Sequence, residues 1–276
     1  MNKKIGIYIP CYNVKNSIAK VLESFSAETI DKVSVFLIVE NKSMDQTLEV
    51  VRGFQVASGP SSSLAKKLTI IANHENYGLG GSQKIAYSYF LSNGFSHFMI
   101  IHGDNQGNAE TIAQNFLREL ELHPDTDFIA ASRFLKSSDT SRYSLLRTVA
   151  NKFFNWLTYV LSGVRMSDSG CGIVLIKTAI LRDIPFHLFN NSAQFNPQLN
   201  IAIYSNTNNK ISEIPIQWKD ALEGSSIRAF RYCWTLFEIL LRYFYCHRIR
   251  GLPIVESLGR SENLQKFEYT IYDTKN

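Results

Sequence analysis

The chain has 276 residues, of which 45% are hydrophobic and 12% aromatic, and its 29 basic and 24 acidic residues give a formal net charge of +5. This composition suffices for a full core in one large domain or two small ones, and it excludes a disordered or fibrous protein. The small basic excess favours anionic partners, such as phosphorylated small molecules or an anionic membrane. It falls short of the charge pattern of a nucleic-acid-binding protein.

The cysteines and the apolar segments indicate the compartment. Four widely spaced cysteines form no Cys-x-x-Cys pair: Cys11, Cys171, Cys233 and Cys246. This usage is typical of a reducing cytosol rather than of a secreted disulfide scaffold. The apolar stretch Ile5–Ile9 stops at Pro10 before it reaches signal-peptide length, and no run approaches the roughly 18 apolar residues of a spanning helix. We expect a cytoplasmic protein, with peripheral attachment to the cytoplasmic face of a membrane left open.

Short β-rich runs alternate with longer helical patterns over most of the chain. The expected strands are Ile5–Ile9, Val33–Val39, Leu68–Ala72, Phe98–Ile101, Phe128–Ala131 and Ile173–Ile176. The expected helices, with apolar residues at three- and four-residue spacing, are Ser17–Ser24, Ser82–Leu91, Ala109–Leu122 and Leu146–Leu161. This alternation predicts an α/β fold, with a mainly parallel sheet flanked by helices.

The last part of the chain is expected to differ in organisation. It contains an expected strand, Ile211–Trp218, then a basic amphipathic helix over Arg228–Arg250, then a polar tail at the periphery. No linker splits the chain. We therefore predict a main domain of residues 1–227, followed by a C-terminal helix and tail of residues 228–276.

Polar residues follow four of the expected strands. The four segments are Pro10–Asn13, Glu40–Asp45, Asn76–Gly81 and His102–Gln106. Ligands of open α/β sheets bind beyond the carboxyl ends of the strands, so we expect these segments to line one crevice. Together they offer carboxylates for a nucleoside, small residues for close approach, and oxygen donors for a metal that binds a diphosphate. The combination predicts a nucleotide-sugar site.

Each of these segments also has a simpler interpretation. Glu40 and Asp45 could begin a helix, because acidic residues favour the first turn. The glycines of Gly78–Gly81 could form only a turn, and a single Asp104 in a turn is weak evidence. The joint occurrence at four strand ends favours the nucleotide-sugar interpretation.

These segments resemble the motifs of the family 2 glycosyltransferases, close to the dolichyl- or polyprenyl-phosphate sugar synthases, over residues 5 to about 235. Ile9–Asn13 resembles the opening strand end of the family, Val39–Thr47 its acidic donor-binding motif and Asn76–Gly81 its asparagine-glycine loop. The resemblance implies a GT-A fold, a UDP- or GDP-sugar donor, and contact between the carboxylate at Glu40 and the nucleoside. The residues expected to bind the donor or its phosphates are Pro10, Tyr12, Asn13, Glu40, Asn41, Ser43, Asp45, Asn76, Gly78, Gly80, Gly103, Arg147, Ser226 and Arg228.

The segment His102–Gln106 resembles the Asp-x-Asp-x-Gln metal motif of the family, with Asp104 and Gln106 at metal-binding positions. The resemblance therefore implies a divalent metal, Mg²⁺ or Mn²⁺. His102 stands where the first aspartate usually lies. Imidazole is a poorer ligand than carboxylate for Mg²⁺ and a tolerable one for Mn²⁺, so we expect a weakened or shifted metal site. The alternative is that His102 is a hydrogen-bonded turn residue that never touches metal.

Two arginines resemble the acceptor side of the family. Ala131–Phe134, which includes Arg133, resembles its Ser-Arg motif, and Arg147 with Asn151 resembles the basic helix that follows. Arginine suits phosphate because its planar fork binds two oxygens at once. Surface solvation or helix pairing is the alternative for each of them.

Two further motifs depart from the family pattern. Ser167–Gly172 resembles the Asp-x-x-Ser-Gly motif near the acceptor, with a spacing one residue shorter, and it implies an acceptor-side role for Asp168. Glu213–Trp218 and Gly224–Arg228 resemble the strand and the flexible loop that close over the donor diphosphate, but the lysine common in that loop is absent. Ser226 and Arg228 are the available substitutes.

The C-terminal helix combines aromatic residues and leucines with arginines over Arg231–Arg248. This composition suits the interface of a membrane that carries an anionic or lipid-phosphate substrate. Packing against the main domain or against a second subunit is the alternative.

We therefore expect a metal-dependent, inverting glycosyltransferase whose acceptor is a polyprenyl or dolichyl phosphate or a glycan. The expected catalytic residues are Asp104, Arg133 and Asp168, of which Asp168 would serve as the base for a sugar hydroxyl. A lipid phosphate is already anionic and needs no strong base.

Two other classes of protein stay open. A catalytically silent nucleotide-sugar-binding protein is suggested by His102 and by the missing loop lysine. A nicotinamide-dependent oxidoreductase would require a glycine fingerprint after the first strand, where Pro10–Asn13 stands instead.

Overall fold

The computed structural model describes residues 3–59, 61–219, 229–259 and 265–273. Its strands are β1 Ile5–Cys11, β2 Val35–Glu40, β3 Leu68–Asn73, β4 His97–Ile100, β5 Phe128–Ser132, β6 Asp139–Arg142, β7 Val174–Lys177, β8 Ile211–Pro215, β9 Gln217–Lys219 and β10 Tyr269–Asp273. Eight of them form one sheet in the order β10-β3-β2-β1-β4-β7-β5-β8, and β6 pairs with β9 in a separate ribbon. The pairs β1–β2, β2–β3, β1–β4 and β5–β8 are parallel, as the sequence predicts.

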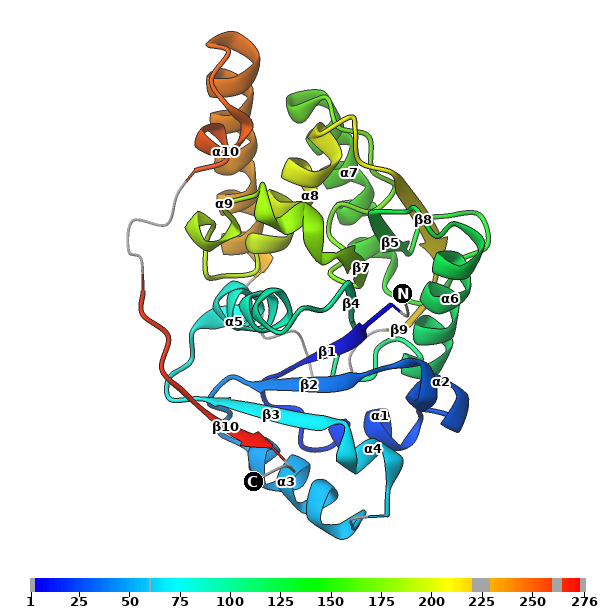
Figure 1. Cartoon of the computed structure of the whole chain (residues 1–276). Helices are drawn as coiled ribbons and strands as arrows, with labels where there is room; N and C mark the ends of the chain where they lie inside the picture. The colour runs from blue at the N-terminus through cyan, green and yellow to red at the C-terminus, as the bar shows by residue number, and fades with distance from the viewer. Residues whose placement is uncertain (1–2, 60, 220–228, 260–264, 274–276) are drawn as a thin grey trace.

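Helices lie on both faces of this sheet (Figure 1). They are α1 Ile18–Glu23, α2 Ala27–Lys32, α3 Thr47–Ala57, α4 Ser63–Lys66, α5 Gly78–Ser92, α6 Ala109–Leu122, α7 Leu145–Ser162, α8 Phe195–Ser205, α9 Ala229–Tyr243 and α10 Ile254–Ser257, with short helices η1 Thr178–Arg182, η2 Phe186–Leu188 and the π-helical η3 Phe244–Ile249. The architecture is the α/β sandwich expected from the alternation of strands and helices.

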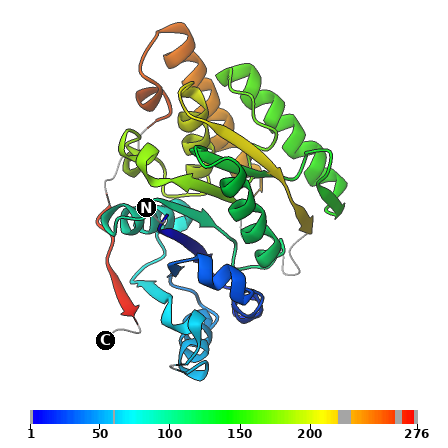
Figure 2. The ribbon, with the colours of Figure 1, turned by 45° about the vertical axis from the view of Figure 1, so that its right-hand side comes forward.

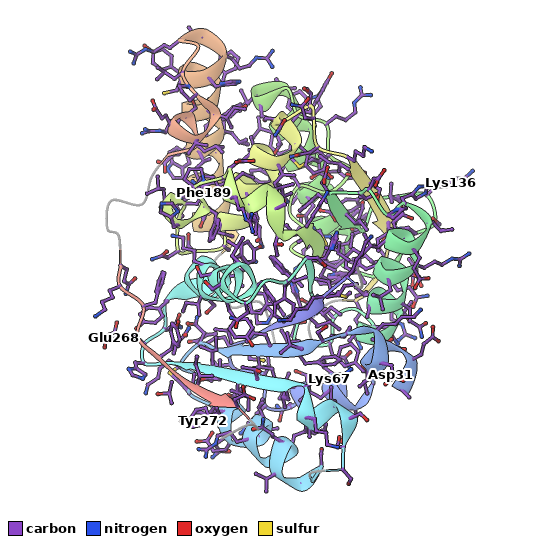
Figure 3. All side chains as sticks on the ribbon, in the orientation of Figure 1. Asp31, Lys67, Lys136, Phe189, Glu268 and Tyr272 are labelled. Carbon is purple, nitrogen blue, oxygen red and sulfur yellow. The ribbon has the colours of Figure 1, made fainter. Side chains whose placement is uncertain are left out.

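Alternating side chains divide the core into two layers. Ile7 and Ile9 of β1 face the cluster that includes α1 and α6, whereas Tyr8 faces the cluster that includes α5, α8 and α9. Because both faces of β1 are covered, nearly every residue in it is buried, which explains its unbroken apolar sequence. Side chains fill the space between the sheet and its helices throughout (Figure 3).

Local signals set several helix ends. Asn108 caps α6 by accepting a hydrogen bond from the backbone N–H of Thr111 at 2.9 Å. Gly163 ends α7 with φ of 78°, a left-handed conformation that glycine adopts without strain. Both helices therefore match their predicted ranges to within about a residue.

The C-terminal part of the chain differs from the prediction in two respects. The expected strand Ile211–Trp218 is divided: β8 belongs to the main sheet, and β9 turns away at Pro215 to pair with β6. The polar tail contains β10, which pairs antiparallel with β3 at the sheet edge; Figure 3 labels Tyr272 within this strand and Glu268 just before it. The proposed division after residue 227 lies outside the described residues and stays a prediction.

Candidate functional site

The carboxyl ends of β3, β2, β1 and β4 lie side by side because these strands are parallel neighbours in that order. The polar segments that follow the four strands therefore meet at one edge of the sheet. The antiparallel β7 enters the sheet from this same edge, which adds the segment before Val174. The structure thus brings together most of the residues that the sequence assigns to a site.

The loop after β1 is hydrogen-bonded to the loop after β2. The backbone N–H of Asn13 donates to Ser43 Oγ at 3.0 Å, and Asn13 Oδ1 accepts from the N–H of Met44 at 2.9 Å. Asp45 Oδ2 accepts from the N–H of Lys15 at 3.1 Å. Burial opposes ionisation of Asp45, but its hydrogen bonds hold the pKa of its carboxyl below the ordinary value. In the protein alone, these polar side chains hold the two loops together.

Glu40 is the last residue of β2 and is only 3% exposed. Its Oε1 accepts from the backbone N–H of Ser43 at 2.6 Å. Pro10 and Tyr12, on the neighbouring strand end, are half-buried. Burial, with Glu40 adding its charge, raises the pKa of the thiol of Cys11 well above its ordinary value. This strand end therefore offers a carboxylate and no thiolate.

A chain of amides connects β2 with the loop after β3. Asn41 Oδ1 accepts from the backbone N–H of Tyr77 at 3.0 Å, and its Nδ2 donates to Asn76 Oδ1 at 2.9 Å. Asn76 Oδ1 also accepts from the N–H of Gly78 at 2.9 Å. Because backbone N–H groups can only donate, they fix the orientation of both amides. Asn76 is exposed, and with its oxygen engaged in this way its NH₂ group is the donor that it can offer. Asn73, which the sequence did not single out, donates to Asn41 Oδ1 at 3.0 Å.

Gly78 and Gly80 lie against the segment that precedes α8. A Cβ on Gly78 would collide with the backbone carbonyl of Asn191, and one on Gly80 would lie 2.7 Å from Cβ of Phe195. Gly78 also has φ of 73°. Packing and backbone conformation therefore account for both glycines in the protein alone, and their contact with a ligand stays a prediction.

The segment after β4 contains the expected metal-binding residues. Asp104 is exposed, and its Oδ1 accepts from the backbone N–H of Gln106 at 3.2 Å. Gln106 Nε2 donates to the carbonyl of Lys219 at 3.1 Å, which orients the amide. Gly103 brings this segment close to β1, because a Cβ there would lie 3.0 Å from the carbonyl oxygen of Pro10.

His102 is half-buried beside the ring of Trp218, with the ring centroids 5.9 Å apart. Burial, with Arg133 adding to it and Asp104 opposing it, lowers the pKa of His102 below 6.5. The imidazole is therefore neutral at pH 7, which is the form that ligates metals.

A divalent metal at this site would take its ligands from the segment after β4. Within the described residues, no three His, Cys, Asp or Glu side chains gather closely enough to hold an ion. Asp104 supplies one carboxylate and Gln106 one amide oxygen, which fits an ion that takes its remaining ligands from phosphate and water. The neutral imidazole of His102 suits Mn²⁺ better than Mg²⁺. The residues fit a metal that arrives with a diphosphate.

Arg133 and Asp168 form a buried bidentate ion pair. Arg133 Nε donates to Asp168 Oδ2 at 2.7 Å and Nη2 donates to Oδ1 at 2.8 Å, while the backbone N–H of Arg133 donates to Oδ2 at 3.1 Å. The side chains are 8% and 0% exposed. Burial disfavours the charged guanidinium, but Asp168 raises the pKa of Arg133 above its ordinary value, so the arginine stays charged. Both carboxylate oxygens of Asp168 are occupied.

Aromatic and amide side chains surround this ion pair. Arg133 Nη1 donates to the hydroxyl of Tyr143 at 3.1 Å, and Asn151 Nδ2 donates to the same hydroxyl at 3.0 Å. Asn151 also donates to the carbonyl of Arg147 at 2.7 Å, which ties the pair to the first turns of α7. Ser226 and Arg228, expected to act at the donor diphosphate, lie outside the described residues.

Two residues that the sequence did not assign to the site connect the segments after β4 and before β7 with the Arg133–Asp168 ion pair. The guanidinium of Arg133 lies 5.8 Å from the ring centroid of Trp218, the same ring that neighbours His102. Asn196, at the start of α8, lies so close to Gly172 that a Cβ there would be 2.7 Å from its Nδ2. Trp218 ends the segment that resembles the strand before the closing loop, whereas Asn196 stands in no recognisable motif. The folded chain places both at the site.

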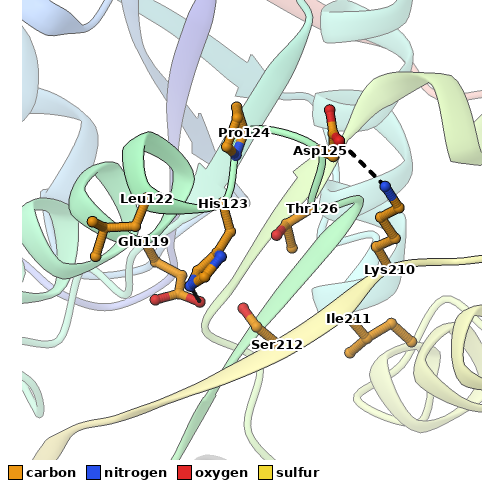
Figure 4. Close-up of a pocket in the computed structure, with 9 residues that line it drawn as sticks. All are labelled: Glu119, Leu122, His123, Pro124, Asp125, Thr126, Lys210, Ile211 and Ser212. Atoms are coloured by element: carbon orange, nitrogen blue, oxygen red, sulfur yellow. Dashed lines mark hydrogen bonds and ion pairs between the residues drawn. The ribbon is translucent and has the colours of Figure 1, made fainter.

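A surface pocket of about 470 Å³ lies away from this site (Figure 4). It is formed where α6 ends and where β5 and β8 begin, at the opposite edge of the sheet. Its lining includes the ion pair of Asp125 with Lys210, at 3.3 Å, and a contact of His123 with Glu119 at 4.0 Å. These four side chains are polar and mostly exposed, and they belong to no motif of the candidate site.

Known structures share this fold. Crystal structures of glucosyl-3-phosphoglycerate synthase from Mycobacterium tuberculosis match with TM-scores of 0.61 over 91% of this chain and 81% of theirs. One contains phosphoglyceric acid at 13% identity, and another contains Mn²⁺, UDP-glucose and phosphoglyceric acid at 14% identity. At this identity the likeness establishes the GT-A fold.

Two archaeal relatives match at the level of sequence. A UDP-N-acetylglucosamine–dolichyl-phosphate N-acetylglucosaminyltransferase of Methanococcus voltae is 21% identical over 66% of this chain and 72% of its own length. An uncharacterised protein of Methanocaldococcus jannaschii is 22% identical over 78% of this chain and 81% of its own length.

The profile of the family described as glycosyl transferase family 2 matches residues 6–184. That span runs from β1 to the end of η1 and covers the strand ends described above, and so this chain belongs to glycosyl transferase family 2 and is a glycosyltransferase.

Proposed function

We propose that this glycosyltransferase moves a sugar from a UDP- or GDP-sugar to the phosphate of a polyprenyl or dolichyl lipid, with a divalent metal and with inversion at the anomeric carbon. The observation that carries the choice of acceptor is the closed ion pair of Arg133 and Asp168.

A sugar hydroxyl would need a general base, because it must lose its proton as it attacks. The base expected from the sequence, Asp168, has both oxygens occupied by three N–H donors of Arg133. A phosphate monoester has a second pKa of about 6 and is already anionic at neutral pH. The ion pair therefore favours a phosphate acceptor over a glycan hydroxyl, and it gives Asp168 the role of positioning Arg133.

The relatives support the same choice. The Methanococcus voltae relative is named for a dolichyl-phosphate acceptor, and the Mycobacterium tuberculosis structures contain phosphoglyceric acid. Both acceptors carry phosphate. The presence of Mn²⁺ with UDP-glucose in one of those structures supports a metal and a nucleotide-sugar donor.

The remaining residues take their roles from their positions. Glu40 and the outward NH₂ of Asn76 would bind the nucleoside, since they lie on adjacent strand ends. Asp104 and Gln106, with His102, would hold the metal, which would neutralise charge on the leaving diphosphate. Arg133, held in place by Asp168, would offer its remaining N–H donors to the acceptor phosphate.

A lipid acceptor places the protein at a membrane. The described helices include none that is long and apolar enough to cross a bilayer. We therefore infer a peripheral protein at the cytoplasmic face, with the helix that begins at Ala229 near the lipid.

The experiment is a transfer assay with a short-chain polyprenyl phosphate and radiolabelled UDP- or GDP-sugars, with and without Mn²⁺, beside thermal-shift measurements of donor binding. We expect glycolipid product that requires Mn²⁺ and is lost in Asp104→Asn. The matched control, Asp125→Asn, removes a carboxylate from the pocket of Figure 4 and should retain full activity. Donor binding without transfer to any acceptor would instead identify a catalytically silent protein, and full turnover in Asp104→Asn would exclude the metal role.

A further inference from the structure

The solvent side of helix α7 is apolar, whereas the solvent side of a helix in a globular protein is ordinarily polar. Its large apolar side chains that are between 45% and 79% exposed are Leu145, Leu146, Val149, Phe153, Trp156, Tyr159 and Val160. They recur at three- and four-residue spacing and so form one stripe along the solvent side. The opposite side, with Phe154, Leu157 and Leu161, packs against the core. An exposed apolar stripe of this length is uncommon on a monomeric protein and marks an interaction surface.

Helix α9 and η3 extend this apolar surface. Their exposed large side chains are Trp234, Leu241, Tyr245 and Ile249. Helix α7 packs against α9, and both helices lie on the outside of the molecule (Figure 2). An apolar groove of about 230 Å³ lies between them, lined by Phe153, Phe154, Leu157, Cys233, Trp234 and Phe237. These two helices and η3 form what we call the α7–α9 face, which holds most of the exposed large hydrophobic side chains of the described residues.

The charged residues of the α7–α9 face are mainly basic. Helix α7 carries Arg147 and Lys152 and no acidic residue. Arg165 follows it, with its guanidinium 5.3 Å from the ring centroid of Tyr159. On the second helix the acidic Glu238 accepts a hydrogen bond from Trp234 Nε1 at 2.7 Å. Arg248 is exposed at the far end of the face. Aromatic side chains among mainly basic ones match an anionic surface.

We propose that the α7–α9 face docks on a lipid bilayer that contains anionic headgroups. The two helices lie in the plane of the interface, with the aromatic stripe in the boundary between headgroups and acyl chains and the basic residues among the phosphates. Tryptophan and tyrosine are the residues that concentrate at this depth of a bilayer. The face includes α7, whereas the sequence predicted contact through the C-terminal helix alone.

A second copy of the chain would fit this face less well. A two-fold interface brings the same patch of both subunits together, so Lys152 and Arg165 would lie near the basic residues of the second copy. Like charges at an interface disfavour association. Anionic lipid supplies the opposite charge to Lys152 and Arg165.

Docking of this kind needs neither a donor nor sugar transfer. The proposal rests on the peripheral membrane location inferred above and names the surface that makes the contact. It can fail while transfer to a soluble short-chain acceptor succeeds, or succeed while transfer fails.

The three tryptophans provide a direct measurement. Trp156 and Trp234 lie on the α7–α9 face and are 57% and 55% exposed, whereas Trp218 is 8% exposed at the candidate site. Titration with vesicles of phosphatidylcholine and phosphatidylglycerol should shift the emission of the full chain to shorter wavelength. Brominated lipids should quench it. The double variant Trp156→Phe/Trp234→Phe retains Trp218 alone and should show neither effect.

A second pair of variants tests the energetics by co-sedimentation. Phe153→Ser/Trp156→Ser should reduce binding to anionic vesicles by roughly tenfold or more, because two aromatic side chains no longer leave water. The control, Val56→Ser/Leu122→Ser, removes two apolar side chains that are 80% and 62% exposed on α3 and α6, and it should bind as the unmodified chain does. Far-ultraviolet circular dichroism establishes that both fold.

Three results would overturn the proposal. The first is no emission shift and no co-sedimentation with anionic vesicles. The second is equal loss of binding in the control pair. The third is a dimer in light scattering without lipid that Phe153→Ser/Trp156→Ser converts to a monomer, which would assign the face to a second copy of the chain.

Discussion

Replacement of Asp168 by asparagine removes the negative charge from an ion pair that is almost wholly out of water. Asp168 is 0% exposed and accepts three hydrogen bonds from Arg133, two of them at 2.7 and 2.8 Å from the guanidinium. Asparagine keeps the shape but leaves the buried guanidinium without a counter-charge. Breaking a buried pair in this way costs about 3–5 kcal/mol of the free energy of unfolding. For a domain of this size we expect a fall in melting temperature of roughly 10 °C.

Urea unfolding followed by circular dichroism measures this loss. The matched control is Asp125→Asn, which removes the same charge from a pair with Lys210 that is 80% and 65% exposed. Exposed pairs contribute about 0–1 kcal/mol, so the control should unfold close to the unmodified chain.

The double variant Arg133→Met/Asp168→Leu separates charge from packing. It leaves no uncompensated charge, so it should recover most of the stability that Asp168→Asn loses. If Asp168→Asn is as stable as the Asp125→Asn control, or if the double variant is no more stable than Asp168→Asn, the account of this ion pair is wrong.

Three further predictions concern the core. Gly80→Ala should lower the free energy of unfolding by about 1–3 kcal/mol in urea titrations, because the new Cβ would collide with the segment before α8. The control Gly53→Ala lies on α3, where a Cβ has nothing within 4 Å, and it should raise the free energy of unfolding by about 0.5–1 kcal/mol. Equal effects of the two substitutions would contradict the packing described. Burial raises the pKa of the Cys11 thiol, so iodoacetamide should modify the buried Cys11 much more slowly than the half-buried Cys246, as read by mass spectrometry. Burial lowers the pKa of the Lys84 amine from 10.5 to about 8, so between these values the unfolded chain holds a proton that the folded chain has lost. The stability of the unmodified chain relative to Lys84→Met should therefore rise with pH in this window, by at most about 1.4 kcal/mol per pH unit, and a flat difference would refute the assignment.

Much of the fold could be predicted from the sequence because its signals are local. The strand that begins at Ile5 is apolar throughout since both faces of it are buried. Helix α6 has a capping asparagine and a regular apolar spacing, and its predicted ends are those observed. Helix α8 was missed because it is buried on nearly all sides, which removes the periodicity on which the prediction depends. Strand β10 was missed because an exposed edge strand such as Tyr269–Asp273 needs no apolar face.

The candidate site was predictable in part for a related reason. The polar strand ends could be grouped because parallel strands align their carboxyl ends, a rule that needs no coordinates. The pairing of Arg133 with Asp168 joins residues 35 positions apart and follows only from the antiparallel entry of β7. Asn196 reaches the site from an element with no motif, and the contacts of Trp218 with His102 and Arg133 follow only from the fold. What each residue binds stays a prediction.

The pairing of β10 with β3 has a consequence for synthesis of the chain on the ribosome. Residues 269–273 close an edge whose partner, residues 68–73, is made about two hundred residues earlier. Throughout that interval the backbone donors and acceptors along the outer side of β3 have no strand beside them, and an open edge of this kind attracts strands of other chains. The nascent protein therefore spends most of its elongation with one side of its sheet unprotected, and we expect chaperones that shield such edges to matter more for its yield than its final stability does.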